Sequence, residues 1–134
     1  DDSSVLEPSA GRGNLADLIY DRCENLTAIE LHCEHYEYLQ EKPYRTIRRD
    51  FLKITEAETG KFSHIISCPP FKSTLHLNKM KSLLKPYGHL VSLVMADSID
   101  DYWMKYYTKL NLDFKAPNGD MLECGIINYS PGDN

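Results

Sequence analysis

The chain has 134 residues, of which 42% are hydrophobic and 26% are charged, and its formal net charge is −5. This length and composition predict one globular domain over residues 1–134 with a core of its own. The negative charge excludes an overall basic field that would attract nucleic acid. One local basic cluster is interpreted as a solvated loop and strand entrance in preference to a nucleic-acid contact: Arg45, Arg48, Arg49 and Lys53.

Cysteine usage and hydropathy indicate the compartment. The four cysteines are scattered with no CxxC pair, and no stretch resembles a signal peptide or a membrane-spanning apolar run. We therefore expect reduced thiols, a cytoplasmic location and no membrane association. His32-Cys33-x-His35 suggests a metal site, but no second ligand pair follows at zinc-like spacing. These residues are predicted to lie on a helix surface, and no metal is expected.

Apolar runs and helical spacing alternate along the chain. A short buried strand at Val5-Leu6 leads into a glycine turn, and the apolar residues that follow predict a helix from Asn14 to Cys23. Strands that alternate with helices predict an α/β sheet, mostly parallel, with helices on both faces and a closing antiparallel strand pair. The later elements are expected as strands at 26–31, 46–52, 64–67 and 89–95, helices at 34–42, 75–84 and 101–110, a surface turn at 56–60, and the antiparallel pair at 112–116 and 125–129.

The predicted last helix is rich in aromatic residues. Such residues can stack on nucleic-acid bases, but packing against the sheet is the favoured interpretation here. The residues concerned are Tyr102, Trp103, Tyr106 and Tyr107.

Gly11 and Gly13 lie between the first strand and its helix. Glycine permits a tight turn and lets a ligand approach the bare backbone, so this corner is typical of a nucleotide-binding site. The Gly-x-Gly-x-x-Ala pattern at 11–16 also satisfies a relaxed dinucleotide fingerprint. A nicotinamide cofactor is disfavoured because Glu7-Pro8 separates the strand from the glycines and no third glycine follows.

The stretch Glu-Pro-Ser-Ala-Gly-Arg-Gly at 7–13 resembles the first motif of the class I S-adenosylmethionine-dependent methyltransferases, and most closely that of their amino-methylating branch. The resemblance extends over nearly the whole chain, including the leucine-rich end of a helix and the proline-glycine turn at 83–90. It implies a Rossmann-like methyltransferase sheet and S-adenosyl-L-methionine as the cofactor. In the family, the backbone from Gly11 to Gly13 would pass beside the methionine part of the cofactor, and Glu7 would lie near its ammonium group.

Two further acids follow the expected second and third strands. Glu30 lies 17 residues beyond Gly13, and a carboxylate at this strand end can accept both ribose hydroxyls. The family places an acid at Asp50 that accepts from the adenine amine, with Phe51 packing on the purine, although Asp50 also fits a simple turn. The predicted cofactor-binding residues are Glu7, Pro8, Ala10, Gly11, Gly13, Glu30, Leu31, Asp50 and Phe51.

Cys68-Pro69-Pro70-Phe71 after the fourth strand indicates the reaction class. It resembles the Asn/Asp/Ser-Pro-Pro-Tyr/Phe motif of the amino-methylating enzymes. An aromatic amine is a poor nucleophile, so a side-chain oxygen and a backbone carbonyl that accept its two hydrogens favour attack, while the aromatic residue stacks on a flipped base. The predicted catalytic residues are Cys68, Pro69, Pro70 and Phe71, with Ser67 in reserve.

Cys68 departs from the family pattern, because a thiol is a weak acceptor and cannot reproduce an amide oxygen. Ser67 would substitute only if the turn shifted by one residue. Three interpretations stay open: a slower enzyme, an enzyme with a different amine target, and a protein that binds cofactor without turnover. A nucleophilic cysteine is disfavoured because pyrimidine-carbon methyltransferases place proline before the cysteine. A fifth interpretation makes Pro-Pro-Phe a strand-ending turn only.

The predicted function is methyl transfer to an exocyclic amine, with adenine in DNA as the preferred substrate. An RNA base and a protein glutamine amide are the alternatives within the enzymes, and a catalytically silent cofactor-binding subunit is the alternative outside them. The expected partner is nucleic acid, DNA in preference to RNA. The stretch after Phe71 is short and no target-recognition domain is present in the sequence, so sequence-specific reading would require a separate recognition subunit.

Overall fold

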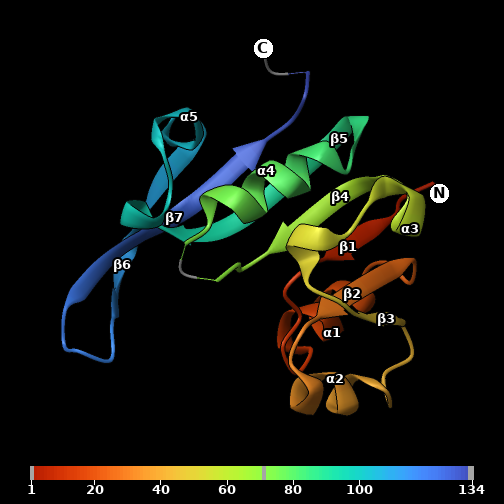
Figure 1. Ribbon diagram of the computed structural model, residues 1–134. Coiled ribbons are helices and arrows are strands. Elements are labelled where there is room, and N and C mark those ends of the chain that lie inside the picture. The colour runs from red at the N-terminus through yellow and green to blue at the C-terminus, as the bar shows by residue number, and fades with distance from the viewer. Residues whose placement is uncertain (1, 71, 133–134) are drawn as a thin grey trace.

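The computed structural model describes residues 2–70 and 72–132, and within them the strands form a seven-stranded sheet of order β3-β2-β1-β4-β5-β7-β6 (Figure 1). The first five strands are mutually parallel, whereas β7 runs antiparallel to both β5 and β6. The strands are β1 (Val5–Glu7), β2 (Leu26–Glu30), β3 (Arg45–Arg48), β4 (Phe62–Ser67), β5 (Leu84–Met95), β6 (Tyr107–Lys115) and β7 (Met121–Tyr129).

Helices cover both faces of this sheet, as predicted. On one face, α1 (Asn14–Tyr20) and α2 (Cys33–Leu39) pack through Ile19 and Leu39 into a buried cluster with β1 and β2. On the other face, α4 (Thr74–Ser82) and α5 (Asp101–Met104) pack through Met80 and Trp103 into a larger cluster. The remaining short elements are η1 (Phe51–Lys53), α3 (Glu56–Thr59) and η2 (Ala96–Ser98). The predicted α/β class and closing antiparallel pair are confirmed.

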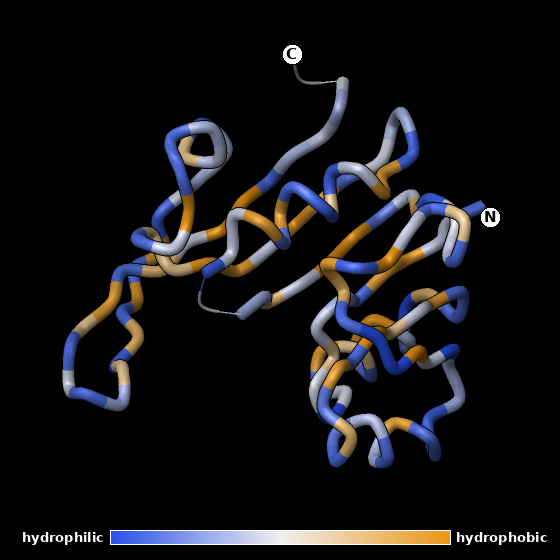
Figure 2. The backbone as a smooth tube through the Cα atoms, viewed as in Figure 1, coloured by the Kyte–Doolittle hydropathy of each residue, from blue (hydrophilic) through white to orange (hydrophobic). Residues whose placement is uncertain are grey.

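Side-chain alternation in the central strands explains this two-sided core. Val5 and Leu6 are neighbours in β1 but belong to different buried clusters, because successive strand residues point to opposite faces. All five residues of β2 are buried, which is typical of a parallel strand covered on both sides. Figure 2 shows apolar residues along these inner strands, whereas the helices alternate between apolar and polar positions.

The structure differs from the sequence-based expectation after Asp101. A helix was expected at 101–110, but α5 ends at Met104 and β6 begins at Tyr107, where it pairs with Ile127. Pairing with β7 outweighs local helical spacing here, since tertiary context commonly overrides propensity. The β6–β7 pair extends beyond the rest of the sheet (Figure 1).

Smaller differences concern element boundaries. The surface turn expected at 56–60 contains the short helix α3, the strand expected at 46–52 ends at Arg48 before η1, and β5 begins at Leu84, ahead of residue 89. No helix in the described part of the chain is long and apolar enough to cross a bilayer.

The aromatic residues at 102–107 divide between core and surface. Trp103 is fully buried, its indole N–H donates to Asn78 Oδ1 at 2.9 Å, and its ring lies 5.5 Å from that of Tyr129. Tyr102, Tyr106 and Tyr107 are partly buried against the same cluster. Core packing therefore accounts for the buried tryptophan, as the sequence favoured.

We expect Trp103→Ala to lower the free energy of unfolding by about 3–5 kcal/mol, because it removes a fully buried indole and leaves the Asn78 oxygen without its donor. Urea denaturation measures the change. Tyr87→Ala is the control, since this side chain is 89% exposed. Its removal should change the free energy of unfolding by less than about 0.5 kcal/mol. Equal effects of the two substitutions would contradict the assignment of Trp103 to the core.

Candidate functional site

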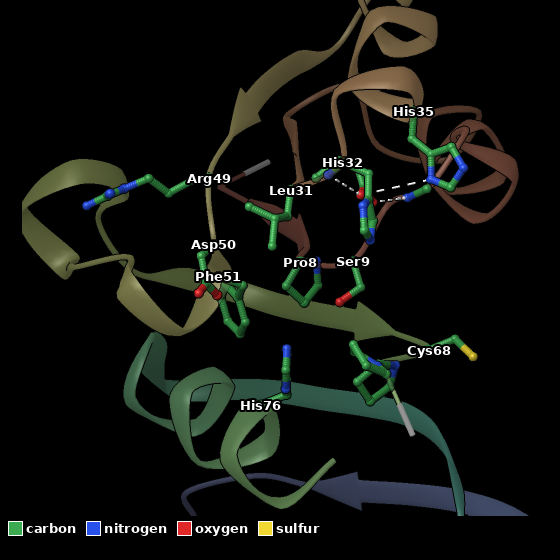
Figure 3. A pocket seen from close by; sticks show the side chains of 14 residues that line it. Pro8, Ser9, Leu31, His32, His35, Arg49, Asp50, Phe51, Cys68 and His76 are labelled. Carbon is green, nitrogen blue, oxygen red and sulfur yellow. Dashed lines mark hydrogen bonds and ion pairs between the residues drawn. The ribbon is translucent and has the colours of Figure 1, made fainter. Parts of the chain in front are cut away.

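The site lies where the carboxyl ends of β1, β2 and β4 meet. Because β1 pairs with β2 on one side and β4 on the other, the chain direction across the sheet reverses there, and such reversals open ligand-binding crevices in parallel sheets. A cavity of about 340 Å³ occupies this position (Figure 3). It is lined by Pro8, Ser9, Gly11, Glu30, Leu31, His32, His35, Arg49, Asp50, Phe51, Cys68, Pro69, Pro70 and His76.

The glycine loop after β1 folds over the end of β2. Ala10 N–H donates to the Ile29 carbonyl at 2.9 Å, and Gly11 N–H donates to Glu30 Oε1 at 2.8 Å. Gly11 and Gly13 have positive φ angles of 57° and 92°, which side chains disfavour. The two glycines are therefore required by backbone conformation, and the loop presents backbone to the cavity at Gly11.

The Glu30 carboxylate connects two loops of the site. Its Oε1 accepts from Gly11 N–H, its Oε2 accepts from His32 N–H at 2.9 Å, and His35 Nδ1 lies 4.0 Å from Oε2. The carboxylate is nearly buried but lines the cavity. Each oxygen keeps a free lone pair, since an ionised carboxylate accepts about four hydrogen bonds. Glu30 is thus placed to receive two hydroxyl groups of a ligand.

Glu7 lies beneath the loop and is only 1% exposed. Its Oε1 accepts from Ser9 N–H at 3.2 Å, whereas Oε2 is buried with no hydrogen-bond partner among the described residues. Burial raises the pKa of Glu7 to about 8; the Ser9 hydrogen bond opposes this shift and nearby Glu30 adds to it. Glu7 does not line the cavity; its unpartnered oxygen would suit a cationic group that reached it.

Asp50 and Phe51 form the opposite end of the cavity. Asp50 Oδ1 accepts from Leu52 N–H at 3.0 Å, which caps η1, and Phe51 is buried beside it. The Arg49 side chain turns outward and pairs with Glu58 at 2.8 Å. Of the basic cluster, Arg49 is thus held in a surface ion pair at the rim of the cavity.

The diproline corner, Cys68-Pro69-Pro70, forms a further part of the cavity wall. Cys68 lines the cavity, and burial, together with Glu7, raises the pKa of its thiol, so the group is a neutral thiol at physiological pH. Ser67 is buried at the end of β4, and its Oγ has no partner among the described residues; the serine is not on the cavity wall. Phe71 lies outside the described residues. In Figure 3 the Cys68 sulfur is at the far end of the cavity from Asp50.

Hydrogen bonds anchor this corner to the loop after β5. Ser73 Oγ donates to the Pro70 carbonyl at 2.9 Å, and Ser98 Oγ donates to Ser73 Oγ at 3.2 Å and to the Met95 carbonyl at 2.7 Å. Ser73 N–H also donates to the Ser98 carbonyl at 3.1 Å. The corner is therefore held by residues other than position 68.

Five cavity residues were not predicted from the sequence as site residues: Ser9, His32, His35, Arg49 and His76. His76 belongs to α4, and its ring lies 6.0 Å from that of Phe51 (Figure 3). Its buried Nδ1 has no partner among the described residues, and burial lowers its pKa while Asp50 opposes the shift. His76 lies four residues before the buried Met80 and therefore on the same side of α4. Only the fold shows that this side of the helix reaches the cavity.

The histidines and cysteine at 32–35 lie around the start of α2. Cys33 is exposed, whereas His32 and His35 line the cavity next to Glu30. Across residues 2–70 and 72–132, no group of three His, Cys, Asp or Glu side chains is arranged to hold a metal ion.

The strand order, the closing antiparallel pair and the position of the cavity define the class: the chain has the fold of the class I S-adenosylmethionine-dependent methyltransferases. No protein-family model matches the sequence, and no curated protein matches it at a significant level.

Solved structures show the same fold at low sequence identity. Protein 1320 of Thermoplasma acidophilum has a TM-score of 0.71 and 18% identity, over 98% of this chain and 76% of that one. TrmN from Thermus thermophilus has a TM-score of 0.64 and 15% identity, over 93% and 43%. NodS, an N-methyltransferase from Bradyrhizobium japonicum solved with S-adenosyl-L-homocysteine, has a TM-score of 0.66 and 16% identity, over 94% and 77%. The chain thus spans less than half the length of TrmN.

The raised pKa of Glu7 predicts a specific pH dependence of stability. A folded-state pKa of about 8, above the usual 4.5, means that the neutral form is favoured by folding. The resulting stability is fully present below about pH 4.5 and is lost as the pH rises to about 8, a change of about 4–5 kcal/mol. We expect Glu7→Gln to abolish this loss, so that the variant is more stable than the wild type at about pH 8.5.

Urea denaturation of the ligand-free protein at about pH 5 and about pH 8.5 measures this difference. Glu37→Gln is the matched control, because Glu37 is an exposed residue of α2. If wild type and Glu7→Gln lose the same stability between the two pH values, Glu7 is not the neutral buried group described here.

Proposed function

We propose that this chain binds S-adenosyl-L-methionine and transfers its methyl group to a planar exocyclic amine, with adenine in DNA as the substrate. One observation carries the proposal: a single cavity is lined by the glycine loop, Glu30, Asp50 and the diproline corner. Four segments far apart in the sequence, each expected to touch cofactor or target amine, meet there.

The groups around the cavity fit the parts of the cofactor. Glu30 has free lone pairs for the ribose hydroxyls, and the orphaned Glu7 Oε2 suits the ammonium group of the methionine part. Asp50, Phe51 and Leu31 line the end proposed for adenine, with Pro8 and Ala10 shaping the turn of the loop. When bound, the cofactor supplies a sulfonium methyl group for in-line displacement by a nitrogen lone pair.

The diproline corner would activate the amine. Among the described residues no donor reaches the Pro69 carbonyl, whereas the Pro70 carbonyl is occupied by Ser73. The Pro69 carbonyl is therefore free to accept one amine hydrogen, which favours the charge that develops as the nitrogen attacks. The second hydrogen would face Cys68, whose neutral thiol is a weak acceptor. This arrangement supports turnover at a reduced rate.

The choice of adenine in DNA rests on the likeness of the Cys-Pro-Pro-Phe sequence at 68–71 to the motif of the amino-methylating enzymes. NodS is an N-methyltransferase, which supports nitrogen as the acceptor atom. RNA bases and protein glutamine carry similar planar amines and are the alternatives within this function. A separate recognition subunit would supply sequence-specific DNA contacts.

A second candidate is a cofactor-binding subunit without turnover. It is favoured by one observation: the side chain at the corner that faces the cavity is a thiol, and the neighbouring Ser67 hydroxyl is buried. Calorimetric titration with S-adenosyl-L-homocysteine, beside transfer of labelled methyl groups to DNA, RNA and protein, separates the candidates. Binding with transfer to DNA supports the enzyme, binding without transfer to any polymer supports the silent subunit, and no binding contradicts both.

We expect Cys68→Asn to raise the rate of methyl transfer to its amine substrate about tenfold or more, because an amide oxygen replaces a weak acceptor at a position where such groups stabilise the transition state. Steady-state transfer of labelled methyl at saturating cofactor measures the rate. Cys33→Ser is the control, since Cys33 is an exposed thiol that does not line the cavity. An unchanged or lower rate for Cys68→Asn would show that residue 68 does not accept from the amine.

A further inference from the structure

Three linked polar side chains lie against the glycine loop at Gly13, and none of them lines the cavity; we call them the buttress: Asp17, Lys42 and Tyr44. Tyr44 OH donates to Asp17 Oδ1 at 2.8 Å, and Lys42 Nζ donates to Asp17 Oδ2, also at 2.8 Å. Asp17 is in the first turn of α1, whereas Lys42 and Tyr44 belong to the segment between α2 and β3. The buttress thus connects two segments 25 residues apart in the sequence.

Gly13 packs directly against this group. A Cβ atom at Gly13 would lie 2.5 Å from Tyr44 OH, 3.1 Å from Leu39 Cδ2 and 3.4 Å from Asp17 Oδ1. The Asp17 amide also donates to the Gly13 carbonyl at 2.7 Å. Glycine is therefore needed here for close approach as well as for its φ of 92°. The Tyr44 hydroxyl therefore occupies the space that a side chain at residue 13 would take.

The charges of the buttress hold it together. Burial alone would raise the pKa of Asp17, but the hydrogen bonds from Lys42 and Tyr44 outweigh this effect and leave the pKa below its usual value. Burial and the bond to Asp17 raise the pKa of Tyr44, so the phenol keeps its proton and stays a donor. Tyr44 is 6% exposed, and its ring lies 5.7 Å from that of Tyr20. The hydroxyl is thus fixed in place by packing as well as by its acceptor.

We infer that Tyr44, Asp17 and Lys42 are positioning residues that hold the glycine loop in its ligand-binding shape before the ligand arrives. The inference rests on the proposed function, in which this loop receives the amino-acid end of S-adenosyl-L-methionine. Glu30 holds the loop from the cavity side at Gly11, and the buttress holds it at Gly13. A preformed loop avoids the ordering cost that a mobile loop would incur on binding.

The two ends of the ligand distinguish this role from a merely structural one. S-adenosyl-L-homocysteine carries the amino-acid part, whereas 5′-methylthioadenosine has the same nucleoside without it. Tyr44→Phe removes the hydroxyl and keeps the ring. We expect it to weaken binding of S-adenosyl-L-homocysteine about tenfold and to leave the affinity for 5′-methylthioadenosine within about twofold. Calorimetric titration well below the melting temperature gives both dissociation constants.

Tyr20→Phe is the matched control, because Tyr20 contacts the Tyr44 ring but its own hydroxyl has no hydrogen bond within the described chain. It should change neither affinity. Asp17→Ala combined with Tyr44→Phe should weaken binding of S-adenosyl-L-homocysteine by less than the product of the two single effects, since both substitutions break the same hydrogen bond.

A second measurement needs no ligand. In Tyr44→Phe, hydrogen exchange at the Gly13 and Asp17 amides should be faster than in the wild type and in Tyr20→Phe, while exchange in β4 and β5 stays unchanged. Equal weakening for both ligands, no weakening for either, or unchanged exchange at Gly13 and Asp17 overturns the inference. A wild type that binds neither ligand contradicts the proposed function instead, and the exchange result then decides separately whether the buttress holds the loop.

Discussion

The position of β1 between β2 and β4 is the constraint on which the site depends. Parallel strands present their carboxyl ends at one edge of a sheet, so Glu7, Glu30 and Cys68, each at or just after a strand end, are brought to the same edge. The loop after β3 reaches the same edge with Asp50. If β4 were added beyond β3, two strands would separate Cys68 from Glu7, so the position of β4 beside β1 is what brings the diproline corner to the glycine loop.

Two carboxyl groups at this edge of the sheet, those of Glu7 and Glu30, have different numbers of hydrogen-bond donors and different burial. Glu30 receives two backbone N–H groups, whereas Glu7 receives one and is buried more deeply. Hydrogen bonds to a carboxylate favour its charged form, and burial disfavours it. Burial therefore favours the neutral acid form of Glu7 beside Glu30 below its raised pKa of about 8.

The sequence predicted the central part of the fold, because β1, β2 and β4 are short apolar runs, each followed by a turn or loop signal. The predicted ligand-binding roles of the residues at these strand ends stay predictions. The sequence failed where long-range contacts decide the structure. Tyr107 and the residues after it form β6 because β7 pairs with them, which no local spacing shows. The sequence did not predict the position of His76 or the Asp17–Tyr44 contact for the same reason. These residues lie on ordinary helices and loops, and their partners are distant in the sequence.

The two halves of the site are held by separate sets of contacts, and this separation bears on the meaning of Cys68. The glycine loop is fixed by Glu30 and by the residues against Gly13, whereas the diproline corner is fixed by Ser73 and Ser98. The Cys68 side chain takes part in neither set. Under the proposed function, a change at residue 68 would therefore alter the acceptor offered to an amine without altering the backbone that presents it or the loop that would bind cofactor. For that reason the proposed cofactor affinity and methyl-transfer rate would vary independently, and a thiol at this position is compatible with a fully formed cavity.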